Sequence, residues 1–459
     1  MEQSITSTTT TFTPCASLAA LGCHLRQIAL FDPVRQQVQI AQKTMIHTPI
    51  DKLYDAFITI LAGAHGLVEV NTRLRSDVAV QQAFGRAACA EQSTIQATLN
   101  ACTSTNVAEL TAALTTIYRT HSQGYRHPYA TQYQLLDVDL SGLPCGKQAA
   151  LATKGYFPKQ RNRRGRQLGR VLATRYGEIV TDQLLEGRAL LVKALVPLLQ
   201  AAEQVLNLDA AKRARTIVRL DSGGGSIADI NWLLERGYQV QTKDYSRARA
   251  RKLGAGVTDW FDDPQIAGRQ VGWVATSSAE YVRELQRIAV RWQKANGQWE
   301  YAVVLSSLTT AEVLTELGLP STLVQDVPAV LLAYVRLYDA RGGGVETSFK
   351  DDKQGLGLTK RSKKRPAAQQ MLTLLGTLAH NVVVWARGWL APQEPQVRRY
   401  GMQRMVRDVF HISGFLLQNS QGHILAIVLN VRAPLVRGLT QGLAQLLRPA
   451  QVVVNWGQT

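Results

Sequence analysis

A strand–helix–strand pattern in the middle of the chain constrains its fold more than any other feature. Residues 216–221 (TIVRLD) form a buried-type strand that ends in a carboxylate and leads into a glycine-rich turn. Residues 227–237 then have the pattern of a helix closed by a glycine, and residues 238–243 that of a second strand. An earlier alternating segment, residues 133–140 (YQLLDVDL), predicts a further strand. We therefore expect an α/β fold, with a mixed sheet flanked by helices.

A chain of 459 residues is too long to fold around one ordinary hydrophobic core, and changes of pattern along it predict six segments. We expect a poorly ordered N-terminus (1–25), a helical N-terminal DNA-binding domain (26–128), the first part of the sheet domain (129–243), a β-rich insertion (244–304), the second part of the sheet domain (305–395) and a basic C-terminal region (396–459). Two short helices on either side of Gly85 fit either a DNA-binding helix-turn-helix or an ordinary αα-hairpin.

The charge of the chain predicts a polyanionic partner. Fifty-two Lys and Arg against 34 Asp and Glu give a formal net charge of +18, and nucleic acid is the commonest polyanion. Five cysteines without a CxxC pair favour a reducing compartment. The N-terminus lacks a signal-peptide pattern, and no apolar run reaches the roughly 18 residues of a membrane span. We expect a cytoplasmic protein that associates with the nucleoid when it is bound to DNA.

Three basic clusters could follow a phosphate backbone, although a charge run is usually only a solvated face. The first is Arg161, Arg163, Arg164, Arg166 and Arg170, the second Arg247, Arg249, Arg251 and Lys252, and the third Lys360, Arg361, Lys363, Lys364 and Arg365. Each lies close in sequence to a segment suspected of function, which favours contact with phosphates. The affinity for DNA should then fall steeply as the salt concentration rises.

A few acidic side chains are placed to carry chemistry. Asp137 and Asp139 lie two apart on a predicted strand and project from the same face, and Asp221 ends another strand. Glu346 lies in a helical region. Carboxylates at the ends of neighbouring strands, joined by one from a helix on that sheet, repel each other unless a hard divalent cation neutralises them. The pattern predicts a Mg²⁺ site, in which Mn²⁺ should substitute, suited to in-line phosphoryl displacement.

The glycine run after Asp221 must also be weighed as a phosphate-binding loop. It lacks the Gly-Lys-Ser/Thr ending of a P-loop and only weakly imitates a dinucleotide fingerprint. The carboxylate that precedes it would face a bound pyrophosphate and repel it. We therefore expect no site for a nucleotide cofactor.

Four of the eight tryptophans fall in the predicted β-rich insertion. They most simply form the core of a small domain. The alternative is stacking on a base extruded from DNA, for which Trp260 and Trp299, in turn-like contexts, are the candidates.

Four segments together resemble a known family. They are LDVDLSGLP (136–144), KGYFPKQRNRRGRQLG (154–169), VRLDSGGGS (218–226) and YDARGGGVETSFKDDKQGLGL (338–358). In this order they resemble a DDE transposase of the insertion-sequence type, and the last is similar to the Tyr-Arg-Glu-Lys signature of the insertion-sequence-four-like superfamily. The resemblance runs from about residue 73 to the C-terminal region. It implies a ribonuclease-H-like catalytic domain interrupted by an all-β insertion, and Mg²⁺-dependent cleavage and joining of DNA ends.

Carried over to this sequence, the resemblance implies catalytic, metal-binding carboxylates at Asp139, Asp221 and Glu346. Asp137 remains an alternative to Asp139. The signature residues that hold the backbone of the transposon end would be Tyr338, Arg341 and Lys353.

One departure from the family pattern concerns the helix that carries the glutamate. Four residues instead of three separate Arg341 from Glu346, and three of them are glycines. Three glycines inside a helix cost about 1 kcal/mol each relative to alanine. We expect a π-bulge or a local break at residues 342–344 that restores Glu346 to the metal-facing side.

The favoured reading is a DNA transposase that cleaves transposon ends and transfers them into a target. Its partners would be double-stranded DNA, both the terminal inverted repeats and the target, and we expect a dimer in the DNA complex. Two alternatives stay open, a non-catalytic DNA-binding protein derived from a transposase and a metal-dependent nuclease without strand transfer.

Overall fold

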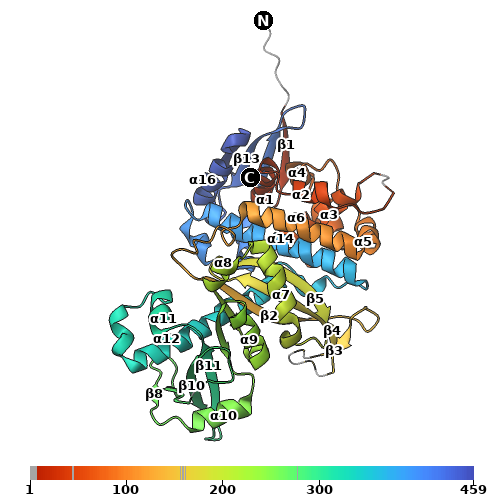
Figure 1. Cartoon of the computed structure of the whole chain (residues 1–459). Coiled ribbons are helices and arrows are strands. Elements are labelled where there is room, and N and C mark those ends of the chain that lie inside the picture. Colours follow the sequence, from red (N-terminus) through yellow and green to blue (C-terminus); the bar gives the residue numbers. More distant parts are fainter. Residues whose placement is uncertain are drawn as a thin grey trace. The chain divides into compact units, whose positions relative to one another are not determined.

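The computed structural model describes residues 8–458 except 44, 45, 156, 158, 159, 161 and 277. The chain divides into two compact units (Figure 1). The first combines Met1–Ser122, Leu143–Ala152 and Phe349–Thr459, and the second combines Gln123–Gly142 and Thr153–Ser348. None of the helices in the described part is both long and apolar enough to cross a membrane.

The second unit is built on a mixed sheet of ten strands, as the strand–helix–strand pattern predicts. Its order is β3 (Thr153–Lys154), β4 (Arg164–Ala173), β2 (Gln134–Pro144), β6 (Thr216–Leu220), β7 (Gln239–Lys243), β11 (Trp299–Ser306), β10 (Gln286–Gln293), β9 (Arg269–Trp273) and β8 (Phe261–Asp262), with β5 (Glu178–Glu186) paired to β4. Strand β6 is parallel to both β2 and β7. Pairing is antiparallel from β7 to β8 and between β4 and β5.

The helices of this unit that contact the sheet include α7 (Leu191–Leu206), α9 (Ile227–Glu235), α10 (Arg247–Ala255) and α12 (Val327–Asp339). The unit also contains α8 (Ala210–Ala214) and α11 (Thr310–Glu316). Helix α7 contacts β4 and β5, and α12 contacts β9, β10 and β11. Leu331 and Tyr334 of α12 share one buried cluster with Ile217 and Val304 of the sheet.

The segment expected as a β-rich insertion, residues 244–304, differs from the expectation in two ways. Its strands β10 and β11 do not form a separate sheet, because β11 pairs with β7 and so extends the central one. It also contains a helix, α10, that the sequence analysis missed. The sequence of α10, RARARKLGA, is too rich in arginine to show an apolar stripe, so its helical periodicity is hidden.

The first unit has one core that joins both ends of the chain. Its helices are α1 (Ala16–Gln27), α2 (Asp32–Gln37), α3 (Pro49–Leu61), α4 (Val78–Ala83), α5 (Gln92–Ala101), α6 (Ser104–His121), α14 (Pro366–Leu390), α15 (Met402–Arg404) and α16 (Val436–Leu447). A four-stranded sheet has the order β1 (Thr9–Thr13), β12 (Gly414–Gln418), β13 (Ile424–Asn430) and β14 (Val453–Gly457). Helix α14 lies along α6 and also contacts α3 and α5 (Figure 1).

This arrangement corrects two expectations. Within the described part of the N-terminus, residues 8–25 are ordered, because β1 pairs with β12 and α1 buries Leu18 and Leu21 in the core. The helical N-terminal segment and the C-terminal region also do not form separate domains. The apolar length of α14 is buried against the N-terminal helices, so these distant segments share one core.

The boundary between β5 and α7 also lies elsewhere than expected. Residues 182–206 have the sequence pattern of one long helix, but the strand runs on to Glu186 and the helix begins at Leu191. Asp182 explains the difference, since its carboxylate is held on β5 by Arg170 of β4, at 2.8 Å for both N–O pairs. Both side chains are only 1% exposed, and Arg170 Nη1 also donates to Ser348 Oγ at 2.6 Å.

We predict that Asp182→Ala lowers the free energy of unfolding by about 3–5 kcal/mol, because it leaves the Arg170 guanidinium buried without its carboxylate. The exposed pair of Arg188 and Glu186, on the same edge of the sheet, provides the control. Glu186→Ala should cost less than about 1 kcal/mol. Urea unfolding followed by circular dichroism measures both, and equal losses would contradict the structural role of the buried pair.

Candidate active site

The first acidic side chain of β2 is a structural one. Asp137 lies opposite Arg219 of β6 in the parallel register, and the two side chains form a two-pronged ion pair at 2.6 and 2.9 Å. Asp137 is fully buried and Arg219 is 1% exposed. Arg219 Nη1 also donates to the carbonyl of Leu337 in α12, at 2.9 Å. The Asp137–Arg219 pair therefore holds the sheet to α12, and the carboxylate of Asp137 is fully engaged in it, whereas the Asp139 side chain is 17% exposed.

Asp139 and Glu346 meet on either side of one guanidinium. Arg341 Nη2 is 3.0 Å from Asp139 Oδ2, and Arg341 Nη1 donates to Glu346 Oε1 at 2.7 Å. The Asp139 side chain is 17% exposed and that of Glu346 is 55% exposed, whereas Arg341 is buried. The arginine thus joins a carboxylate of β2 to a carboxylate of the glutamate-bearing helix.

Asp221 directly follows β6 and caps the turn that the three glycines form. Its Oδ1 accepts a hydrogen bond from the backbone N–H of Gly223 at 2.8 Å, at the start of the 3₁₀ turn Ser222–Gly224. The charge of Asp221 raises the pKa of both Asp139 and Arg341, so all three groups share one electrostatic neighbourhood. Within the described residues, however, no three acidic, histidine or cysteine side chains are grouped closely enough to hold a metal ion.

The protonation of Asp139 reflects this neighbourhood. Burial raises its pKa to about 6, Arg341 opposes the shift, and the charges of Asp221 and Glu346 add to it. A carboxyl group with a raised pKa beside other carboxylates is a typical feature of functional sites, although structural clusters also produce it.

A break in the helix places Arg341 and Glu346, as we expected from the extra residue between them. Helix α12 ends at Asp339, Ala340–Gly343 form a 3₁₀ turn, and α13 (Val345–Gly355) begins after Gly344. The break is thus a 3₁₀ turn and not a π-bulge. Gly344 is needed there because a Cβ on it would come within 2.1 Å of Asp137 Oδ2 and 2.8 Å of Thr174 Cγ2.

The other two signature positions lie in different surroundings. Tyr338 is buried in the last turn of α12, and the ammonium group of Lys243 lies over its ring, 4.7 Å from the centroid. Lys353 lies on α13, seven residues after Glu346, in the part of the helix that belongs to the first unit.

Lys243 itself was missed by the sequence analysis. It ends β7, the neighbour of the strand that Asp221 follows, and burial lowers its pKa while the charges of Asp339 and Glu346 oppose that shift. No motif marks it, and only its place at the end of a predicted strand could have drawn attention to it.

The basic clusters divide into buried and exposed side chains. Arg161 lies outside the described residues. Arg166 and Arg361 were expected to bind DNA, but they are only 1% and 5% exposed, which corrects that expectation. Arg166 points inward because β4 runs through the basic segment, and Arg361 donates to the carbonyl of Ala64. Arg170 is also buried, at 1% exposed. The members outside the core are Arg163 and Arg164 of the first cluster, the whole second cluster, and Lys360, Lys363, Lys364 and Arg365 of the third.

Two of these remaining side chains are tied to the first unit's own core. Lys363 Nζ donates to Gln96 Oε1, and Arg365 Nη1 donates to the carbonyl of Asn100, both at 2.6 Å. Both acceptors belong to α5, so these cations also serve to hold the chain after α13 against that helix.

Trp260 and Trp299 enclose a cation. The guanidinium of Arg291 lies over both rings, 4.1 Å from the centroid of Trp260 and 4.4 Å from that of Trp299. Arg291 is fixed in turn by Gln270, whose Oε1 accepts from Nε at 2.7 Å. The ring faces turned toward Arg291 are therefore occupied, and Trp299 remains 37% exposed.

Comparisons with known proteins give a distant likeness. No protein-family model and no curated protein matches the chain. Among solved structures, it is similar to the piggyBac transposase in a synaptic complex with hairpin DNA, with 11% sequence identity and a TM-score of 0.43 over 86% of this chain and 79% of that one. That protein is a transposase, but the comparison does not show that this chain belongs to the insertion-sequence-four-like superfamily. A similarity at this level carries no conclusion about activity.

We predict that Gly344→Ala lowers the free energy of unfolding by about 1–3 kcal/mol, because the new methyl group collides with Asp137. Gly343→Ala is the matched control, since a Cβ at Gly343 meets no atom within 4 Å. It should change the free energy of unfolding by less than about 1 kcal/mol. Chemical denaturation measures both variants, and an unaffected Gly344→Ala protein would contradict the close approach.

We also predict an inverted pH dependence of stability from Asp139. Its pKa in the folded chain, about 6, lies above its unfolded value, so the folded state binds more protons between about pH 4 and 6. Its contribution to stability is therefore fully present below that window and is lost as pH rises through it, with a slope of at most about 1.4 kcal/mol per pH unit. The difference in free energy of unfolding between the wild type and Asp139→Asn, measured from pH 4 to 7, should fall with pH. A rising difference would contradict the raised pKa.

Proposed function

We propose that this protein is a DDE-type DNA transposase that cleaves transposon ends and joins them to a target. One observation carries the proposal. Asp139 and Glu346, separated widely in the chain, come from a strand and a helix to flank the guanidinium of Arg341, and the charge of Asp221, at the end of the neighbouring strand, acts on the same guanidinium. These are the carboxylates that the family resemblance assigns to catalysis.

The proposed fold of the catalytic part is ribonuclease-H-like. The order β5, β4, β2, β6 and β7 supports it, with an antiparallel pair at one edge and parallel pairing from β2 through β6 to β7. In the parallel register Val138 of β2 lies opposite Leu220 of β6, so the next residue along each chain is Asp139 and Asp221. The strands from β8 to β11 then correspond to the proposed insertion.

The donor chemistry of the carboxylates suits a Mg²⁺ ion, which Mn²⁺ should replace, although within the described residues the three are not grouped closely enough to hold one without moving. All three donors are hard oxygens, and Asp139 and Glu346 already flank a cation. Arg341 is an imperfect counter-ion, because its buried Nε and Nη2 have no partner in hydrogen-bond geometry. A divalent ion would also relieve the repulsion that raises the pKa of Asp139. When bound, it would stabilise the charge that develops in a phosphoryl displacement.

The chain's own residues would position the DNA strand. Arg341, once released from a carboxylate, and Lys243 bring positive charge to the reacting phosphate, and Tyr338 supports Lys243 through its ring. Hydrolysis at the transposon end leaves a 3′-OH, which then attacks a phosphodiester of the target. Two ends must be brought together, so we propose a dimer on double-stranded DNA.

Two other functions can be distinguished from this one by the DNA products that each would form. A non-catalytic DNA-binding protein derived from a transposase would bind end-containing DNA but would not nick it in Mg²⁺. A nuclease without strand transfer would nick the DNA but would form no joined product from pre-cleaved ends.

We predict that Asp221→Ala abolishes Mg²⁺-dependent nicking of DNA that carries the element's ends, while the affinity for that DNA stays within about twofold. The reason is that Asp221 is a proposed metal ligand whose carboxylate caps its own turn, and it is not one of the proposed DNA contacts. Asp259→Ala, which removes an exposed acid of the same unit, is the control and should nick normally. Gel assays of nicking and of binding measure both effects, and parallel loss of binding and nicking would count against this role.

A further inference from the structure

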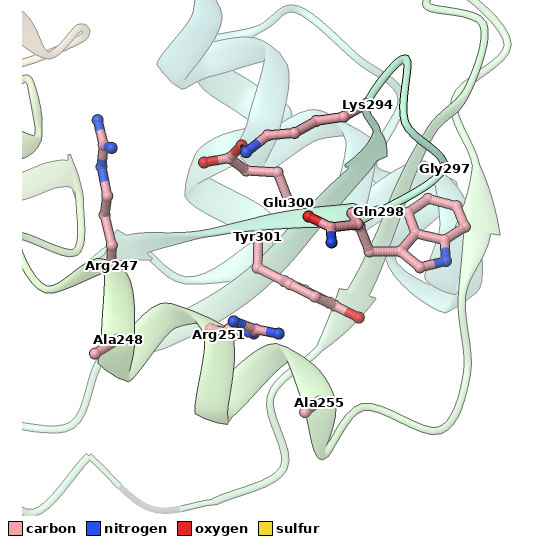
Figure 2. Close-up of a pocket in the computed structure, with 10 residues that line it drawn as sticks. Arg247, Ala248, Arg251, Ala255, Lys294, Gly297, Gln298, Glu300 and Tyr301 are labelled. Carbon is pink, nitrogen blue, oxygen red and sulfur yellow. Dashed lines mark ion pairs between the residues drawn. The ribbon is translucent and has the colours of Figure 1, made fainter.

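An open groove lies between helix α10 and the hairpin of β10 and β11, outside the carboxylate cluster. It has a volume of about 640 Å³ and is lined on one side by Arg247 and Arg251 of α10. Lys294 and Tyr301 belong to the hairpin side (Figure 2). Trp299 of β11 also lines the groove. All of these residues belong to the second unit.

The groove carries an excess of positive charge that the fold leaves uncompensated. Arg247 and Arg251 are exposed, lie one helical turn apart, and form no ion pair among the described residues. Arg249, on the same helix, is different, because Asp244 holds it in a two-pronged pair at 2.6 and 2.9 Å. Lys294 forms an ion pair with Glu300, the one acid of the lining (Figure 2). Three cations therefore face one carboxylate.

The aromatic wall of the groove is rigidly supported. Trp299 and Tyr301 lie two apart on β11, so their side chains share one face of the strand. Trp299 is braced by Arg291 from one side and keeps 37% of its surface exposed. Tyr301 packs on Gly254 of α10, where a Cβ would come within 2.4 Å of the ring. The rings are thus held in place before any ligand arrives.

We propose that this groove binds an unpaired strand of DNA, with its phosphates on Arg247 and Arg251 and a base or sugar against the exposed part of Trp299. A positive groove combined with fixed aromatic walls is the chemistry by which proteins bind single strands. A duplex exposes its phosphates, but the faces of its bases are stacked inside the helix. It would therefore contact the cations of the groove and would not stack on its aromatic rings. The identity of the ligand as DNA rests on the proposed function, but the groove itself is independent of the carboxylates.

The test is the binding of a fluorescein-labelled 12-nucleotide strand to the full chain in EDTA, followed by fluorescence anisotropy over a range of salt concentrations. Each phosphate contact contributes about 0.7 to the slope of log affinity against log salt for a single strand. Arg251→Ala should lower the slope by about 0.7, and Arg247→Ala/Arg251→Ala by about 1.4. Lys193→Ala removes the same charge from an exposed position of α7 in the same unit, outside the groove, and should leave the slope unchanged.

A second variant tests the aromatic wall without changing charge. Trp299→Leu should weaken binding of the single strand by about tenfold and leave binding of a duplex of the same length within about twofold. Equal effects of Arg251→Ala and Lys193→Ala, or equal loss of single-strand and duplex binding in Trp299→Leu, would overturn the proposal. EDTA prevents cleavage, so this binding assay does not depend on catalysis. If the protein shows these binding effects but does not nick end-containing DNA in Mg²⁺, the proposed function is wrong and the proposed single-strand groove is still supported.

Discussion

The buried ion pair between Asp137 and Arg219 is the contact on which the carboxylate cluster depends. It fixes β2 against β6 in register, and through the carbonyl of Leu337 it also fixes the end of α12 to both strands. Removing one partner of such a pair typically costs about 3–5 kcal/mol, because the other charge stays buried. Asp139 lies two residues further along β2, so the same ion pair fixes its position in the sheet. The proposed catalytic carboxylate is thus positioned by Asp137, whose own charge is paired with that of Arg219.

The break between α12 and α13 follows from the same contact. The chain must pass directly over Asp137, and only a glycine at position 344 leaves room for its carboxylate. The turn Ala340–Gly343 then presents Arg341 inward, and α13 restarts with Glu346 in its first turn, where the helix dipole favours an acid. A continuous helix would have carried Arg341 and Glu346 to different sides. The glycines are therefore a requirement of the site, although they weaken the helix as a local element.

The sequence predicted the elements that local patterns encode and missed those set by partners distant in the chain. The strands that hold Asp139 and precede Asp221, and the break before Glu346, were all visible as alternation, a glycine run and an extra residue. Asp137 and Asp139 could not be told apart, because they share a face and only the opposing Arg219 distinguishes them. The inward turn of Arg166 and the strand reaching Glu186 depend in the same way on cross-strand neighbours. The joining of the two chain ends in one core depends on where α14 packs, which no local pattern specifies.

Net charge is therefore a poor guide to where a polyanion would bind this chain. Several arginines that contribute to the +18 excess are buried in ion pairs or among backbone carbonyls, including Arg170, Arg219 and Arg361. Their charge is already committed to holding strands and helices together, and little of it reaches solvent. Exposed cations that form no ion pair with the described residues, such as Arg247 and Arg251, can turn toward a phosphate without breaking a contact that holds the fold. Positive charge is therefore available to a phosphate at such exposed positions, and not wherever basic residues are densest in the sequence.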